Sequence, residues 1–151
     1  MKLTPQEEFG LRCLLRVAQE AGCGGDDPLT IERIADAEGL GYEHTAKIMR
    51  LLRRGDLVVS TRGAKGGYRL SRPAEEIPVW DALVALDPPL VGSEFCDAFS
   101  GRLPNCANST GRCSLRVLWS WVDHTLQEGL RAITVADLIH GRLPVTAGAA
   151  K

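Results

Sequence analysis

Three cysteines, Cys96, Cys106 and Cys113, stand near one another with the spacing C-x9-C-x6-C. The intervals between them are rich in Gly, Pro, Asn, Ser and Thr, so we expect a loop here rather than a helix or a strand. Ordering such a loop costs conformational entropy, and metal binding by converging thiolates can offset that cost. Thiolate is a soft ligand that suits zinc or iron–sulfur chemistry. The spacing therefore indicates a metal centre with one position left for a fourth ligand.

The other two cysteines, Cys13 and Cys23, show no such clustering. A total of five cysteines is odd, which argues against a complete set of internal disulfides. The chain starts without an apolar signal segment, and no run approaches the roughly 18 apolar residues of a membrane span. We therefore expect a protein of the reducing cytoplasm without a membrane partner, where clustered thiols are more often metal ligands than disulfides.

Charge is distributed unevenly along a chain whose net charge is only −1. Between residues 41 and 72, eight basic residues outnumber two acidic ones, which leaves +6 on this segment and −7 on the remainder. A segment of this kind is the electrostatic footprint of a surface that binds a polyanion. Its basic residues are Lys47, Arg50, Arg53, Arg54, Arg62, Lys65, Arg69 and Arg72.

Three helices are predicted in the first part of the chain. The first begins at residues 4–7, Thr-Pro-Gln-Glu, which form a strong helix start with a capping box. The second is expected between Thr30 and Gly39. A third helix is expected from Glu43 to Arg54, after a short turn that contains Gly41. The second and third helices together form a helix-turn-helix, and the third has the length and charge to enter a major groove.

The third helix and the segment after it supply the expected DNA contacts. Residues 57–61 and 68–70 predict a hairpin around a Gly-rich turn, which makes a wing next to the helix-turn-helix. Arg62 and Lys65 at its tip are expected at the minor groove or its phosphates. The helix residues on the outer face are Tyr42, Glu43, His44, Lys47 and Arg50.

The rest of the chain predicts a helix near residues 77–86, a long helix from about Ser114 to Leu130 and a last short helix from Thr134. The apolar stripe of the long helix fits a dimer contact better than a monomer core. The expected fold class is mainly α with a small β-hairpin: a winged helix-turn-helix plus a long C-terminal dimerisation helix. We divide it into a DNA-binding domain at residues 1–87 and a cysteine loop with dimerisation helix at residues 88–151.

The chain resembles a known family over nearly its full length. This is the winged-helix regulator family of the iron–sulfur cluster regulator IscR, the nitric-oxide-sensing repressor NsrR and the cysteine-metabolism repressor CymR. The resemblance implies a homodimeric repressor that binds palindromic promoter DNA and is not an enzyme. It also implies DNA affinity tuned by a cluster that senses iron–sulfur status or redox or nitric-oxide stress. The matching segments are MKLT, GLRCLL, EGLGYEHTAKIMRLLRRGDLV, RGAKGGYRLSRPAEEI, CSLRVLW and TVADLI.

The same resemblance bears on the fourth cluster ligand. The cysteines lie where the sensors have theirs, although the intervals in those sensors are mostly shorter and more equal. The iron–sulfur regulator has a ligating His where this chain has Arg116, and Arg stays protonated and cannot ligate a metal. The nitric-oxide sensor uses a carboxylate from the partner's first helix, and Glu8 stands at that position. The implied ligands are Cys96, Cys106, Cys113 and Glu8, with His44, His124 or water as alternatives to Glu8.

The nuclearity and even the metal stay open at this point. Four protein ligands suit both [2Fe-2S] and [4Fe-4S] clusters, with a slight preference here for [2Fe-2S]. Three Cys and one Glu can also hold Zn²⁺ in a tetrahedron, so a regulator with a structural zinc site is the alternative. An enzyme is disfavoured, because the chain has no C-x-x-C and no Cys with a His nearby in sequence.

Overall fold

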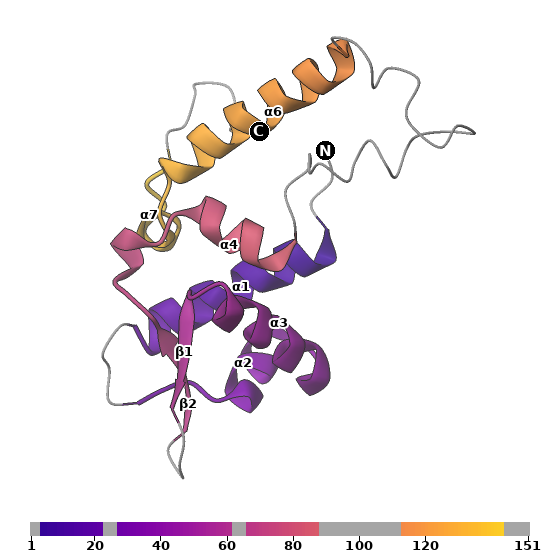
Figure 1. Cartoon of the computed structure of the whole chain (residues 1–151). Coiled ribbons are helices and arrows are strands. Elements are labelled where there is room, and N and C mark those ends of the chain that lie inside the picture. Colours follow the sequence, from indigo (N-terminus) through magenta and orange to yellow (C-terminus); the bar gives the residue numbers. More distant parts are fainter. Residues whose placement is uncertain (1–3, 23–26, 62–65, 88–112, 144–151) are drawn as a thin grey trace, which may run out of the picture.

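The computed structural model describes residues 4–22, 27–61, 66–87 and 113–143, and it confirms the mainly helical fold with a β-hairpin. Figure 1 shows α6 lying above a head that the other elements form. In chain order the elements are α1 (Pro5–Glu20), α2 (Ile31–Glu38), α3 (Tyr42–Arg54), β1 (Val58–Thr61), β2 (Gly67–Leu70), the 3-10 turn η1 (Ala74–Glu76), α4 (Val79–Leu86), α6 (Ser114–Arg131) and α7 (Val135–His140).

The helix starts follow the local capping signals. The Thr4 hydroxyl accepts the Glu7 N–H at 3.2 Å, and the Glu7 carboxylate accepts the Thr4 N–H at 2.6 Å, which confirms the predicted capping box of α1. The Thr30 hydroxyl caps α2 by accepting the Arg33 N–H at 3.3 Å. α2 ends at Gly39, whose φ of 66° lies in the left-handed region that favours glycine. This turn directs the chain into α3 and completes the helix-turn-helix.

The core of the head is shared by α1, α2, α3, the hairpin, α4 and α7. Val135 at the start of α7 is fully buried, and the backbone before it pairs with the segment that leads into α4. The Val79 N–H donates to the Ile133 carbonyl and the Val135 N–H donates to the Ile77 carbonyl, each at 2.9 Å. The division at residue 87 therefore stays a prediction, and α7 packs with the first of the two predicted units.

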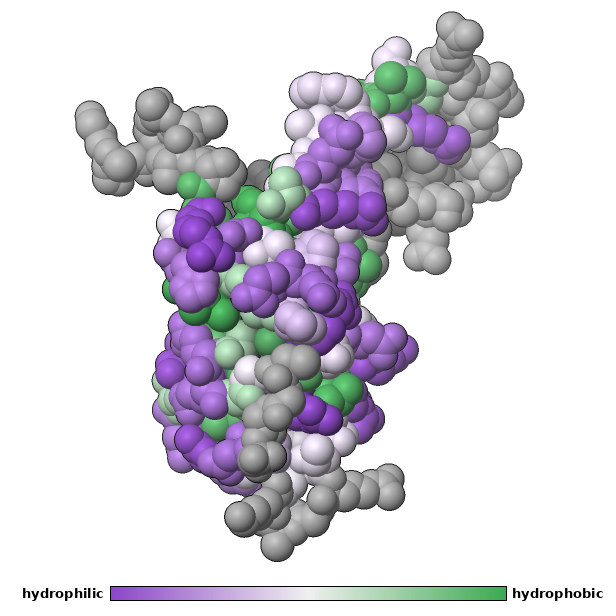
Figure 2. Space-filling view, turned by 90° about the vertical axis from the view of Figure 1, so that its left-hand side faces the viewer, coloured by the Kyte–Doolittle hydropathy of each residue, from purple (hydrophilic) through white to green (hydrophobic). Residues whose placement is uncertain are grey.

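α6 is built differently from the head. None of its 18 residues is buried, and it contacts the head mainly through α4. Its large apolar side chains are 40–65% exposed at Leu115, Val117, Leu118, Trp119 and Trp121. Figure 2 shows one face of the head, where hydrophilic side chains cover most of the surface and hydrophobic ones appear in smaller patches. Among the described helices, none is both long and apolar enough to cross a membrane.

Candidate nucleic-acid interface and cluster site

α3 presents the predicted DNA-facing residues to solvent because its other side is fully occupied by the core. Ile48, Met49 and Leu52 have no exposed surface. The buried Thr45 hydroxyl is satisfied by donating to the Gly41 carbonyl at 3.1 Å. The opposite face carries five exposed residues: Tyr42, Glu43, His44, Lys47 and Arg50. The helix is thereby held rigidly while its polar face stays free.

The wing is fastened to the head beside α3. Strand β1 pairs antiparallel with β2, from Val58 opposite Leu70 to Thr61 opposite Gly67. Leu29 and Tyr68 exchange two backbone hydrogen bonds of 2.8 Å, which hold β2 against the segment before α2. A Cβ on Gly67 would lie 2.8 Å from the Leu29 carbonyl group, so glycine permits this approach. The tip residues Arg62 and Lys65 lie outside the described residues.

A groove between the start of α2 and the wing contains residues that the sequence prediction did not single out. It measures about 310 Å³ and lies beside Tyr42. The Arg53 guanidinium also bridges α3 to β1 by donating to the Ser60 hydroxyl at 3.4 Å. Tyr68 lines this groove and pairs with Leu29. Because that pairing is non-local, no short motif could have indicated it. The polar residues of the groove are Thr30, Glu32, Ser60 and Thr61.

His44 has a second neighbour besides the expected DNA. Its ring meets the Phe9 ring of α1 edge to face, with centroids 5.6 Å apart and planes at 89°. The Arg12 guanidinium lies 5.7 Å from the centre of the same Phe9 ring. Arg12 and Arg16 each pair with Glu38 at 2.9 Å, and the Glu38 carboxylate raises the pKa of Arg16. These contacts join α1 to both helices of the helix-turn-helix.

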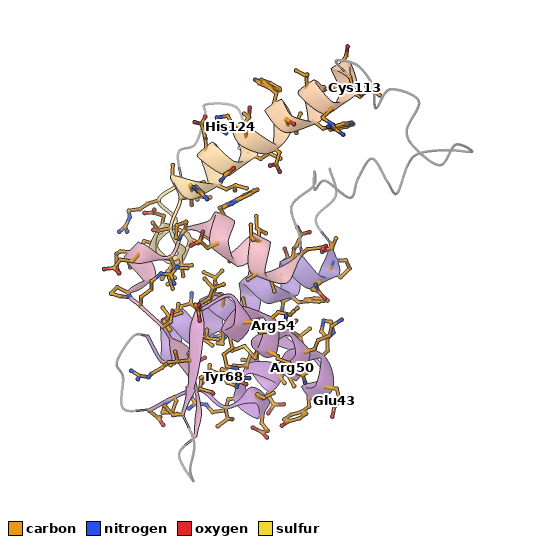
Figure 3. All side chains as sticks on the ribbon, viewed as in Figure 1. Glu43, Arg50, Arg54, Tyr68, Cys113 and His124 are labelled. Atoms are coloured by element: carbon orange, nitrogen blue, oxygen red, sulfur yellow. The ribbon has the colours of Figure 1, made fainter. Side chains whose placement is uncertain are left out.

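Cys113 stands at the N-cap position of α6, where its thiol makes no capping hydrogen bond and is half-buried. The partial positive charge of a helix N-terminus favours an anion such as thiolate. Figure 3 shows Cys113 at the end of α6, well apart from Glu43 and Arg50 on α3. The predicted ligands Cys96 and Cys106 lie outside the described residues. Within the described part of the chain, no three His, Cys, Asp or Glu residues form a group that could hold a metal.

Cys13 has the opposite environment. Its side chain is fully buried between α1 and the rest of the core. Burial raises the pKa of the Cys13 thiol to about 12, and the charge of Glu38 adds to this effect. The group therefore remains a neutral thiol at physiological pH and is unsuited to bind metal. This supports leaving Cys13 out of the ligand set.

Glu7 and Glu8 are adjacent carboxylates with different uses. The Glu7 carboxylate takes part in the capping box, whereas the Glu8 carboxylate is exposed and makes no hydrogen bond or ion pair with the described residues. The same turn of α1 lies against the end of α4, because Gln6 Nε2 donates to the Leu86 carbonyl. The predicted cysteine loop itself, residues 88–112, lies outside the described residues.

His124 occupies a position that limits its use as a ligand. It follows Cys113 by 11 residues on α6. At a rise of about 1.5 Å per residue, the two lie roughly 16 Å apart along the helix axis. They therefore cannot ligate one iron within the same chain. His124 instead faces Glu128, with 3.4 Å between Nε2 and Oε1.

Comparisons with known proteins agree with this architecture. The family model Rrf2, described as an iron-dependent transcriptional regulator, matches residues 3–141. The protein rrf2 of Nitratidesulfovibrio vulgaris is 34% identical over 139 residues, covering 92% of this chain and 87% of the relative. The HTH-type transcriptional regulator IscR of Sodalis glossinidius is 30% identical over 139 residues, covering 92% and 79%.

A solved structure extends the likeness to the fold. The structure of T. potens IscR matches with a TM-score of 0.70 at 26% identity, covering 100% of this chain and 93% of that one. The predicted winged-helix class is thereby confirmed, and the relatives are regulators rather than enzymes. This chain belongs to the Rrf2 family of DNA-binding transcription regulators.

Proposed function

We propose that this chain is a homodimeric repressor whose affinity for promoter DNA is controlled by an iron–sulfur cluster. One observation carries the proposal: a half-exposed Cys113 opens the long helix α6, which has no buried residue of its own. The accessible thiol and the uncovered helix make cluster binding and dimer contact features of the same element. The match to a family described as iron-dependent supports the choice of iron.

The proposed ligands are Cys96, Cys106 and Cys113 of one subunit and the partner subunit's Glu8. A donor set of three thiolates and one carboxylate fits iron, and the carboxylate is the harder and more weakly held of the two ligand types. When bound, the cluster would supply a centre sensitive to redox state and to nitric oxide, with [2Fe-2S] slightly favoured over [4Fe-4S]. Glu8 supports this assignment because it is exposed and unpaired among the described residues, unlike Glu7.

In the proposed complex each subunit reads one half of a palindromic site. Glu43, His44 and Lys47 face the base edges in the major groove. Arg62 and Lys65 reach the minor groove or its phosphates from the wing. Tyr42 and Arg50 flank the base-reading residues on the same exposed face. A cytoplasmic location, where promoter DNA is found and thiols stay reduced, belongs to the same proposal.

Anaerobic purification tests the cluster directly. We expect a coloured protein that contains iron and acid-labile sulfide. Replacing Cys96, Cys106 or Cys113 by Ala should each abolish stable cluster binding, whereas Cys13→Ala and Cys23→Ala serve as controls that keep it. A colourless protein with stoichiometric zinc would overturn iron–sulfur control in favour of the structural zinc alternative.

Glu8 is tested against its neighbour. Glu8→Ala should leave folding and dimerisation intact while shifting the visible spectrum and speeding loss of colour in air. Glu7→Ala is the matched control: it removes the carboxylate half of the capping box and keeps the bond from the residue-7 N–H to the Thr4 hydroxyl, and it should leave the spectrum unchanged. If the spectra of wild type and Glu8→Ala coincide, Glu8 is only a helix-start carboxylate and another group is the fourth ligand.

A further inference from the structure

Arg72 follows the wing, and its guanidinium makes three contacts with the head while 31% of the side chain stays exposed. Nη1 donates to the Asp56 carbonyl at 2.9 Å, and Nε donates to the Glu76 carbonyl at 3.1 Å. Nη2 forms an ion pair with the Asp81 carboxylate at 3.1 Å. All three side-chain nitrogens thus have acceptors within the head. Arg72 belongs to the basic segment by charge count, but its side chain is held within the head by these three contacts. We call this set of contacts the Arg72 tie.

The acceptor at Asp56 lies at the junction between α3 and the wing. Asp56 is two residues past the end of α3 and two before β1, and its φ of +55° is in the left-handed region. A non-glycine residue is strained there and depends on its surroundings to stay. Its carbonyl accepts the Ser71 hydroxyl at 2.5 Å as well as Arg72. The turn between α3 and β1 is therefore held by the two residues that directly follow β2, Ser71 and Arg72.

The other end of the tie is fixed to α4. Asp81 lies in the first turn of α4, and α4 packs tightly on the end of α3. A Cβ on Gly55 would lie 2.4 Å from the Ala85 Cβ, so there is no room for the α3 end to shift toward α4. Arg72 thus connects the end of α3, the exit of the wing and the start of α4 through one planar group.

We propose that Arg72 is a positioning residue for DNA binding, which fixes the angle between α3 and the wing without touching DNA itself. This rests on the proposed function, in which α3 and the wing bind one half-site together. A wing that is loosely held occupies its DNA-ready position for only a fraction of the time. The apparent affinity then falls by that fraction. Loss of the tie should weaken binding although no DNA contact is removed.

Asp81→Asn provides the sharpest test because two explanations predict opposite signs. Removing a negative charge from a DNA-binding protein should tighten binding if only general electrostatics operates. If Asp81 orients Arg72, the same change should weaken promoter binding by about threefold to tenfold. Glu75→Gln is the matched control, since it removes a nearby exposed carboxylate that has no contact with Arg72, and it should not weaken binding. Binding by Asp81→Asn that is equal to or tighter than wild type overturns the proposal.

The salt dependence of Arg72→Gln separates positioning from contact. We expect promoter binding to weaken by about tenfold with an unchanged slope of affinity against salt, whereas loss of a phosphate contact lowers the slope by about one. A slope lowered by one would mean that Arg72 touches phosphate, which overturns the proposal. Arg72→Lys, which keeps the charge but cannot make all three contacts, should weaken binding too and keeps the test decisive if Arg72→Gln fails to fold.

Stoichiometric titration with promoter DNA measures the fraction of each variant that is competent to bind DNA. Each affinity is then corrected for any unfolded fraction. The double variant Arg72→Gln/Asp81→Asn should bind no more weakly than Arg72→Gln alone, because both changes cut the same tie. Additive losses would contradict a shared role. Lys47→Ala tests separately whether α3 contacts DNA at all. Failure of the proposed DNA interface can therefore be distinguished from failure of the Arg72 proposal.

Discussion

The head and α6 are stabilised in opposite ways. In the head, five helices and the hairpin enclose a shared core, and side chains such as Leu52 and Val135 are completely buried. In α6 no residue is buried, and Leu115, Val117 and Trp121 are each more than half exposed. Burying one such side chain contributes about 1.5–3 kcal/mol. The DNA-reading part is therefore complete within one chain, whereas α6 needs a further surface, which the proposed dimer supplies.

The largest effect should come from a pair of leucines that sample the two regions. Leu52→Ala opens a cavity in the core and should lower the free energy of unfolding by about 2–5 kcal/mol. Leu118 on α6 is 46% exposed, so Leu118→Ala should change the unfolding of the head little. Its effect should appear instead as a weaker dimer in sedimentation measurements. Denaturant titration at several protein concentrations separates the two quantities.

The contrast breaks down if Leu118→Ala destabilises as much as Leu52→Ala at every protein concentration. That result would place α6 in the folding unit of the head. An unchanged dimer in Leu118→Ala would instead mean that this part of α6 is not the contact between subunits.

The next effect concerns the DNA-facing side of the head. Lys47→Ala should lower promoter affinity by roughly 1–3 kcal/mol and relax specificity at one base position. Arg62→Ala should weaken binding to all sequences alike and lower the salt slope by about one. Arg33→Ala is the matched control, because Arg33 is an exposed basic residue on α2 whose guanidinium pairs with the Glu20 carboxylate at 3.1 Å. Electrophoretic or fluorescence titration with promoter and random DNA measures all three, and unchanged affinity for both test variants would remove the proposed interface.

The smallest effect should be a pH dependence where α7 starts. Hydrogen bonds from the Thr134 hydroxyl and N–H hold the pKa of Asp137 below its usual value. A lowered pKa means that Asp137 stabilises the fold above about pH 4, its unfolded range, and that this contribution is lost as the pH falls through the lowered value. Asp137→Asn should therefore lower the melting temperature slightly at pH 7, and the difference from wild type should shrink as the pH falls through the lowered pKa of Asp137. A difference that stays constant as the pH is lowered would exclude the carboxylate charge as the cause.

Local chemistry explains what the sequence could predict. Thr4 and Thr30 cap the helices they begin, and Gly39 ends α2, because capping depends only on residues within one turn. The exposed face of α3 followed from helical periodicity alone. Each of these features is determined by residues that lie within a few positions of it in the sequence.

Non-local packing explains what the sequence could not predict. No nearby residue indicates that Val135 pairs with Ile77 and brings α7 into the head. From sequence alone, Arg72 is one more basic surface residue. Its contacts with the Asp56 carbonyl and the Asp81 carboxylate appear only in the folded structure. The contact of His44 with Phe9 likewise joins helices that are far apart in sequence. The ligand set remains a prediction, since Cys96 and Cys106 fall outside the described residues.

The central claim is that the cysteine-bearing part of the chain controls the affinity of the head for DNA. The most direct measurement is promoter affinity under anaerobic conditions, for wild type with and without its cluster and for Cys113→Ala. Coupling between two sites commonly changes affinity by about 5–150-fold. We expect a difference within that range between the two wild-type forms and a single, cluster-independent affinity for Cys113→Ala. Equal affinities for cluster-loaded and cluster-free wild type would contradict the account.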